Sequence, residues 1–375
     1  MKKVILSALV SIFAPIVAWA QLNGDGFYRI QNNASSRYIT IKDDIIGKIN
    51  TSSTTADLTN IVTWRGFDNV KSNPASILYI EAVGSQYNLK AQGTSVYQIT
   101  GGRAYVDLVS SANDTYIIAV KYSGVEVHLY DDSKSKDKGE VKQKGNDTAY
   151  QFWKILPINT SDNYIGLQPT VHAADGYYGT LFASYSFKKV SDGIKIYYIN
   201  AEREGACSLK EITSDVIPAA TPIIFKCDSN DPAQNMIMPV TDEASISSGN
   251  YLAGTYFASV TNKHEEYVDY DATSMRVLGV NDANEIIFTT AKSSDLDENG
   301  HIPMNTCYLR VLNDLTGDFK LVNEDEYAGI YDINADATDS KTNQGIFNLS
   351  GVKVDESKTL KPGIYIKNGK KVVIK

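Results

Sequence analysis

The chain has 375 residues, of which 43% are hydrophobic and 21% are charged. This composition is typical of globular domains and excludes a largely disordered chain. The net charge is −8 and the chain has no dense basic block, which argues against a nucleic-acid partner. At about 100–200 residues per domain, this length predicts two or three domains.

The first 20 residues have the pattern of a secretory signal peptide. Lys2 and Lys3 precede an apolar run over 4–17, and small residues stand three and one positions before a predicted cut between Ala20 and Gln21. The run is shorter than the about 20 residues that a membrane-spanning helix needs. We therefore expect the mature chain to be secreted, periplasmic or at the outer cell surface, and not an integral membrane protein.

Hydrophobic and polar residues alternate over much of 22–158, and clusters of Gly, Asn, Asp and Ser separate the alternating runs. This period of two is typical of β-strands, and no amphipathic helix longer than two turns is indicated. We predict an all-β fold. The clearest strands cover 27–30, 38–41, 77–80, 116–119 and 125–129.

A threefold repeat is indicated in the same segment, because Tyr38, Tyr87 and Tyr116 each lie in a strand that follows a polar turn. The opening G-F-Y-R-I-Q-N resembles the first repeat of ricin-type β-trefoil domains. The closing Q-F-W, which ends in Trp153, resembles their Q-x-W signature. The resemblance implies a trefoil-like domain over 22–158, with Trp153 in its core and glycans as the leading class of ligand.

Ricin-type domains hold sugar hydroxyls with an Asp in an early strand of each repeat. When the repeats are aligned on their strand tyrosines, this position falls near Thr40, Leu89 and Ile118, none of which is acidic. The nearest acidic and aromatic side chains are either turn residues in water or substitute glycan ligands. They are Asp43, Asp44, Tyr130, Asp131 and Asp132.

The middle segment, 159–323, contains an internal duplication. The pattern I-P-x-x-T-x followed by two apolar residues begins at Ile217 and again at Ile302. Because Pro fixes the entry to a turn, the pattern predicts two strand–turn–strand units in a duplicated β-rich module. The segment resembles modules of exported Bacteroidetes proteins.

Three cysteines in the second half of the chain have no metal-binding spacing: Cys207, Cys227 and Cys307. A Cys207–Cys227 disulfide is one possibility. A chain of this length buries enough apolar surface without a disulfide, so buried free thiols are the favoured interpretation.

One segment matches the first half of a calcium-binding loop. Asp295, Asp297 and Asn299 lie in D-x-D-x-N-G, a spacing that can place alternate oxygens around one ion. The twelfth position is Thr306 in place of Glu, so a polar turn is the favoured interpretation and weak calcium binding is the alternative. We therefore expect no cofactor apart from this weak calcium site.

Two segments complete the chain. Residues 324–344 have six acidic residues against Lys341, which predicts a solvated linker. Residues 345–375 contain strand patterns around Asn368-Gly369, a strong hairpin signal. This β tail resembles the C-terminal sorting domains of exported Bacteroidetes proteins.

Motifs for nucleotide binding and for a G-x-S-x-G nucleophile are absent from the sequence. We therefore predict a non-catalytic binding protein outside the cytoplasm, with a glycan or a cell-surface protein as its partner. A structural or adhesion component of the cell surface is the alternative. A hydrolase comes third, because any two carboxylates could meet in the fold.

The leader makes a direct prediction. Mass spectrometry of the exported protein should give a mature chain that begins at Gln21. A product that keeps Met1 would contradict the predicted cleavage.

Overall fold

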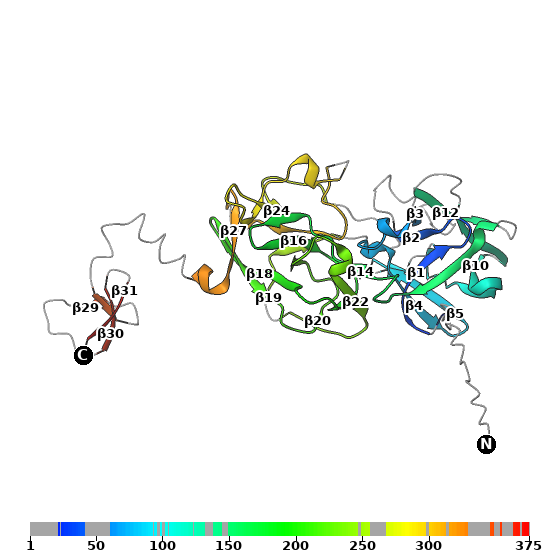
Figure 1. Cartoon of the computed structure of the whole chain (residues 1–375), viewed down its shortest axis with the longest axis horizontal. Coiled ribbons are helices and arrows are strands. Elements are labelled where there is room, and N and C mark those ends of the chain that lie inside the picture. Colours follow the sequence, from blue (N-terminus) through cyan, green and yellow to red (C-terminus); the bar gives the residue numbers. More distant parts are fainter. Residues whose placement is uncertain are drawn as a thin grey trace, which may run out of the picture. The chain divides into compact units, whose positions relative to one another are not determined.

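The computed structural model describes residues 22, 24–41, 61–92, 94–95, 98–99, 102–103, 105–122, 124–131, 138–144, 149–246, 249–255, 268–297, 300–312, 315–328, 346–348, 353–354, 363–367 and 370–374 (Figure 1). The fold is nearly all β, as predicted. The chain forms two compact units. The first comprises 1–166, 236–241 and 257–266, and the second comprises 167–235, 242–256 and 267–375. The first unit thus runs past residue 158, the end of the predicted trefoil-like domain.

The strands of the first unit are β1 (Gly26–Asn32), β2 (Arg37–Ile41), β3 (Ile61–Arg65), β4 (Leu78–Val83), β5 (Gln86–Ala91), β6 (Thr94–Ser95), β7 (Gln98–Ile99), β8 (Gly102–Arg103), β9 (Asp107–Ser111), β10 (Thr115–Tyr122), β11 (Val125–Asp131), β12 (Lys138–Lys144), β13 (Phe152–Pro157), β14 (Ile165–Gly166) and β22 (Met236–Val240). Its 3-10 turns are η1 (Phe67–Asn69), η2 (Pro74–Ser76), η3 (Ala112–Asp114) and η4 (Ala149–Gln151). The five strands that the sequence predicts match β1, β2, β4, β10 and β11.

Six of these strands close into an antiparallel ring. β1 pairs with β4, β4 with β5, β9 with β10, β10 with β13, and β13 with β1. The bridge between Tyr87 and Val106 joins β5 to the segment that leads into β9. A closed ring leaves no unpaired strand edge, so the barrel satisfies its own backbone hydrogen bonds.

Hairpins connect the strands of the ring. β2 pairs with β3 and β11 with β12, and β3 and β12 also pair with each other. In the second repeat, the short β7–β8 pair takes the corresponding place. Each of the three repeats therefore gives its outer two strands to the barrel and its inner strands to a hairpin. This is the trefoil-like connectivity that the sequence predicts.

The threefold repeat has a different register from the predicted one. Tyr87 and Tyr116 lie in β5 and β10, the first strands of their repeats, whereas Tyr38 lies in β2. The equivalent tyrosine of the first repeat is Tyr28 in β1. Because the first repeat has a Tyr in two successive strands, an alignment on Tyr38 gives the wrong register. Two positions after each equivalent tyrosine lies a buried aliphatic side chain of the barrel: Ile30, Leu89 and Ile118.

Trp153 lies in the core of the first unit, as predicted. Its side chain is fully buried, and its Nε1 donates a 3.0 Å hydrogen bond to the Leu129 carbonyl oxygen. Gln151, at the start of the same signature, places its Oε1 2.9 Å from Nδ1 of the buried His128. The Gln and the Trp of the signature therefore both contact β11.

The strands of the second unit are β15 (Val171–Ala173), β16 (Gly176–Leu181), β17 (Ser186–Lys189), β18 (Lys195–Arg203), β19 (Ala206–Glu211), β20 (Val216–Ile217), β21 (Ile223–Cys227), β23 (Leu252–Gly254), β24 (Met275–Val280), β25 (Ile286–Thr289), β26 (Cys307–Arg310) and β27 (Phe319–Asn323). Two 3-10 turns are η5 (Pro232–Gln234) and η6 (Ser293–Asp295). Ten of the strands form one sheet in the order β15-β16-β21-β18-β19-β27-β25-β24-β26-β23.

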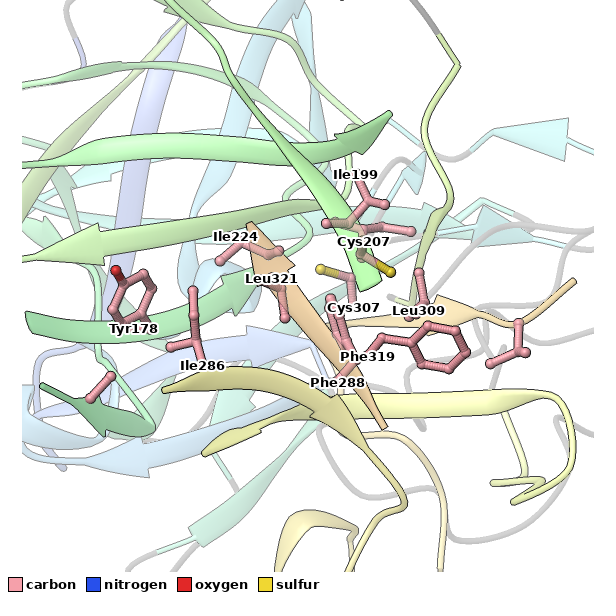
Figure 2. Packing of buried hydrophobic residues seen from close by; sticks show 13 residues of the cluster. Tyr178, Ile199, Cys207, Ile224, Ile286, Phe288, Cys307, Leu309, Phe319 and Leu321 are labelled. Atoms are coloured by element: carbon pink, nitrogen blue, oxygen red, sulfur yellow. The ribbon is translucent and has the colours of Figure 1, made fainter. Parts of the chain in front are cut away.

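The core of the second unit gathers side chains from both halves of this sheet. Figure 2 shows these side chains in one buried cluster, which includes Cys207, Ile224, Leu321, Phe288 and Phe319. All five side chains are buried. Because these residues come from β19, β21, β25 and β27, the core joins strands that are distant in sequence.

The two Ile-Pro segments share their local structure. Ile217 and Ile302 are both buried. The residue three positions later has a left-handed backbone in each segment, with φ 53° at Ala220 and 58° at Asn305. Each segment then enters a strand that pairs antiparallel with an earlier one, β21 with β16 and β26 with β23.

The end of the chain forms a small separate sheet. Residues 324–328 of the predicted linker form a helical turn, and the rest of the linker lies outside the described residues. The strands that follow are β28 (Ile346–Asn348), β29 (Lys353–Val354), β30 (Gly363–Lys367) and β31 (Lys370–Ile374), in the order β29-β28-β30-β31. Lys367 pairs with Lys370, so the predicted hairpin is confirmed. Among the described residues, no helix is long and apolar enough to cross a membrane.

The left-handed turns predict opposite effects for two substitutions. Asn tolerates a positive φ better than Ala does, so Ala220→Asn should raise the free energy of unfolding of the second unit by roughly 0.5–1 kcal/mol. Asn305→Ala should lower it by about 1–3 kcal/mol, because it also removes the 2.9 Å hydrogen bond from Nδ2 to the Phe182 carbonyl.

Calorimetry of the chain without the predicted leader measures both effects. Without that leader the chain has two tryptophans, Trp64 and Trp153, and both belong to the first unit. A transition that tryptophan fluorescence does not report can therefore be assigned to the second unit. An unchanged melting temperature in both variants would contradict the prediction.

Candidate functional site

Asp131, predicted as an exposed turn residue or glycan ligand, is buried at the end of β11. Its Oδ2 lies 2.5 Å from Ser35 Oγ and 3.4 Å from Arg37 Nη1. Its Oδ1 accepts a 3.0 Å hydrogen bond from Thr63 Oγ1. Asp131 is 2% exposed and Arg37 1%, so the prediction that Asp131 faces water is wrong. Both carboxylate oxygens therefore bond to side chains of the same unit.

The turn between β1 and β2 brings Ser35 to this carboxylate. The buried Asn32 accepts hydrogen bonds at Oδ1 from the backbone N–H groups of Ala34 and Ser35, at 3.1 and 3.0 Å. Its Nδ2 donates to the Tyr150 carbonyl oxygen at 2.6 Å. Because an Asn side chain can organise the backbone two residues later, Asn32 sets the turn that Asp131 then holds.

The other predicted glycan ligands are not brought together by the described structure. Tyr130 is half-buried in β11. Asp43, Asp44 and Asp132 lie outside the described residues, as do the two residues of the predicted cleavage site, Ala20 and Gln21.

A different group of side chains lies on the outer surface of the barrel, across β1, β4 and β5. In β4 the inward residues Leu78 and Ile80 are fully buried, so the alternating Tyr79 and Glu81 face outward. Phe27 and Lys90 pair with Tyr79 from the two neighbouring strands. We call Phe27, Tyr79, Glu81 and Lys90, together with Asn88, which is buried at 1% exposure, the Tyr79 face.

The Tyr79 face combines aromatic rings with a charged network. The Phe27 and Tyr79 rings lie 5.0 Å apart, and Lys90 Nζ lies 5.9 Å from the centre of the Tyr79 ring. Glu81 Oε2 lies 2.8 Å from Lys90 Nζ and accepts a 3.4 Å hydrogen bond from Asn88 Nδ2. The surface therefore offers a flat ring beside fixed donors and acceptors.

The electrostatics of Tyr79 fit a neutral phenol. Burial raises its pKa, and the carboxylates of Asp25 and Glu81 raise it further, against an opposing contribution from Lys90. The hydroxyl therefore keeps its proton across the physiological range and can donate a hydrogen bond. This face could not be predicted from the sequence, because its residues come from three strands whose pairing no local pattern gives. The outward alternation of Tyr79 and Glu81 was the one available signal.

The predicted calcium loop uses its acidic side chains internally. Asp295 Oδ2 accepts a 2.8 Å hydrogen bond from the Lys292 backbone N–H. Asp297 Oδ2 lies 3.0 Å from Nδ1 of His301, and Asp269 Oδ1 lies 3.1 Å from its Nε2. Asn299 lies outside the described residues. Among the described residues, no group of three His, Cys, Asp or Glu side chains is arranged to hold a metal ion.

The three cysteines are free and buried, as predicted. Burial raises the pKa of Cys227 and of Cys307 to about 12, and it raises that of Cys207 as well. Because the thiolate is the nucleophilic form, these thiols are unreactive at neutral pH. They pack as small apolar side chains.

No protein-family model matches this chain, and no curated protein matches it. The geometry of the described residues is therefore the basis for choosing among the possible sites. It favours the Tyr79 face, because the described acidic residues of the other two candidates, Asp131, Asp295 and Asp297, are bonded within the fold.

The buried position of Asp131 gives a prediction. Asp131→Ala leaves the Arg37 guanidinium buried without this carboxylate, so it should lower the free energy of unfolding of the first unit by about 3–5 kcal/mol. Chemical denaturation followed by tryptophan fluorescence measures this unit selectively. Asp68→Ala is the control, since the Asp68 side chain is 90% exposed and its ion pair with Lys71 should contribute little. A loss no larger than that of the control would contradict the buried ion pair.

Proposed function

We propose that the protein is an exported, non-catalytic binding protein whose trefoil-like unit recognises glycans at the Tyr79 face. The observation that carries this proposal is the half-exposed Tyr79 ring beside the Glu81–Lys90 pair. Sugar rings present C–H groups on one face and hydroxyls around the edge. An aromatic ring with adjacent planar or charged polar groups complements both features.

Each side chain of the face has a distinct part in this proposal. The Tyr79 ring stacks on the sugar, and Phe27 supports it from the side. Lys90 donates to a hydroxyl oxygen, while Glu81 accepts from a neighbouring hydroxyl. Because Asn88 and Lys90 already hold Glu81 in position, little side-chain entropy is lost when the sugar binds.

A structural or adhesion role at the cell surface is the second candidate. One observation favours this role. Asp131, predicted as a glycan ligand, instead contacts Ser35, Arg37 and Thr63. A trefoil-like fold can be kept for its stability while its familiar binding activity is absent.

A glycan array with the mature chain tests the proposal. Binding should be weak and should fall at least about tenfold in Tyr79→Ala, which removes the stacking ring. Tyr79→Phe keeps the ring and should retain most of the affinity. Tyr177→Ala, which removes a half-buried tyrosine of the second unit, is the matched control.

The stability of each variant separates lost binding from lost folding. Tyr79→Ala should leave the tryptophan-detected unfolding transition close to that of the native chain, because the ring is partly exposed. If the native chain ignores every glycan on the array, or if Tyr79→Ala binds as well as the native chain, the structural role is the better explanation.

A further inference from the structure

Charge is distributed unevenly along this chain. Residues 345–375 contain seven lysines and two acidic residues, a net charge of +5, which leaves −13 for the rest of the chain. All seven cations are lysines, and this segment has no arginine. A basic segment on an acidic protein indicates an anionic partner.

The small C-terminal sheet also leaves apolar side chains accessible to solvent. Among the apolar residues of this sheet whose exposure the structure describes, Ile364 is 37% exposed and none is buried. The others are half-buried and comprise Ile346, Phe347, Val354, Tyr365, Ile366 and Val372.

These apolar residues occupy both faces of the sheet. Phe347 pairs with Ile366, so their side chains lie on the same face of the sheet. Ile364 lies two positions before Ile366 in the same strand and therefore shares that face. Tyr365 pairs with Val372 on the opposite face. Strands of two to five residues in a single layer cannot bury both faces against each other, so a sheet of this kind needs a partner.

We propose that the C-terminal sheet docks on an anionic phospholipid surface. In this arrangement the lysine ammonium groups approach the lipid phosphates, and one apolar face of the sheet enters the interface between headgroups and acyl chains. The apolar part accounts for the exposed Phe and Ile side chains, which a purely electrostatic partner such as a nucleic acid would not use.

The choice of lysine favours lipid over a protein partner. Protein interfaces are enriched in Arg and depleted in Lys, because a rigid guanidinium matches fixed acceptors. Lysine is a mobile point charge on an apolar stem, which can lie along an apolar surface while its ammonium group stays at the phosphates. This proposal is independent of glycan binding, since it uses other residues and another readout.

Vesicle sedimentation with the mature chain tests the proposal. The protein should sediment with phosphatidylcholine vesicles that contain phosphatidylglycerol. With pure phosphatidylcholine vesicles it should stay in the supernatant. Each lysine near an anionic surface contributes about 1 kcal/mol, so Lys367→Ala combined with Lys371→Ala should weaken binding roughly 30-fold. Added salt should weaken the binding of the native chain as well.

Two matched variants make the test specific. Lys195→Ala combined with Lys292→Ala removes the same charge from exposed positions of the second unit and should leave binding unchanged. Lys367→Arg combined with Lys371→Arg keeps the charge and should restore binding, which separates loss of charge from loss of folding. Ile364→Ser should also weaken binding.

Several results would overturn the proposal. They are no binding to the anionic vesicles, equal binding to the neutral ones, or equal loss in the tail and control variants. Binding to soluble heparin without any binding to vesicles would also overturn the lipid proposal. It would indicate that the partner of the basic tail is a soluble polyanion.

Discussion

The buried carboxylate of Asp131 joins the first and third repeats of the barrel unit. Its partners come from the β1–β2 turn, from β2 and from β3, while Asp131 itself ends β11. The same hairpins pair through β3 and β12. A buried charge is tolerated only where its partners are fixed, so this ion pair requires the hairpins to meet in one register. The outward position of Tyr79 then depends on the barrel that these hairpins cover.

Local patterns were enough to predict the strands, the C-terminal hairpin and the burial of Trp153, because each depends on alternation or on a short motif. The register of the threefold repeat was not predictable in the same way. Tyr28 and Tyr38 lie in consecutive strands with similar sequences, and only the pairing of β1 with β13 shows that Tyr28 belongs to the barrel. Strand order depends on long-range pairing, which sequence alternation does not contain.

The candidate sites were harder to predict than the fold. An Asp near a predicted turn is usually exposed, and Asp131 departs from this rule because a distant strand supplies Arg37. In the same way, Asp297 followed a calcium-loop spacing, yet His301 now contacts its carboxylate. Both contacts illustrate one point. A sequence motif gives the possible ligand residues, but the fold determines which other side chains contact their carboxylates.

Arginine and lysine are placed according to whether their hydrogen-bond acceptors are fixed or mobile. Arg29 is fully buried, and its guanidinium donates to Ser76 Oγ at 3.0 Å and to Asn163 Oδ1 at 2.9 Å. Arg37 is equally enclosed. A planar fork suits acceptors that a rigid core holds in place, whereas the lysines of the C-terminal segment suit acceptors that move. The core of the first unit therefore uses its arginines for architecture, whereas the net positive charge of the C-terminal segment comes from lysines alone.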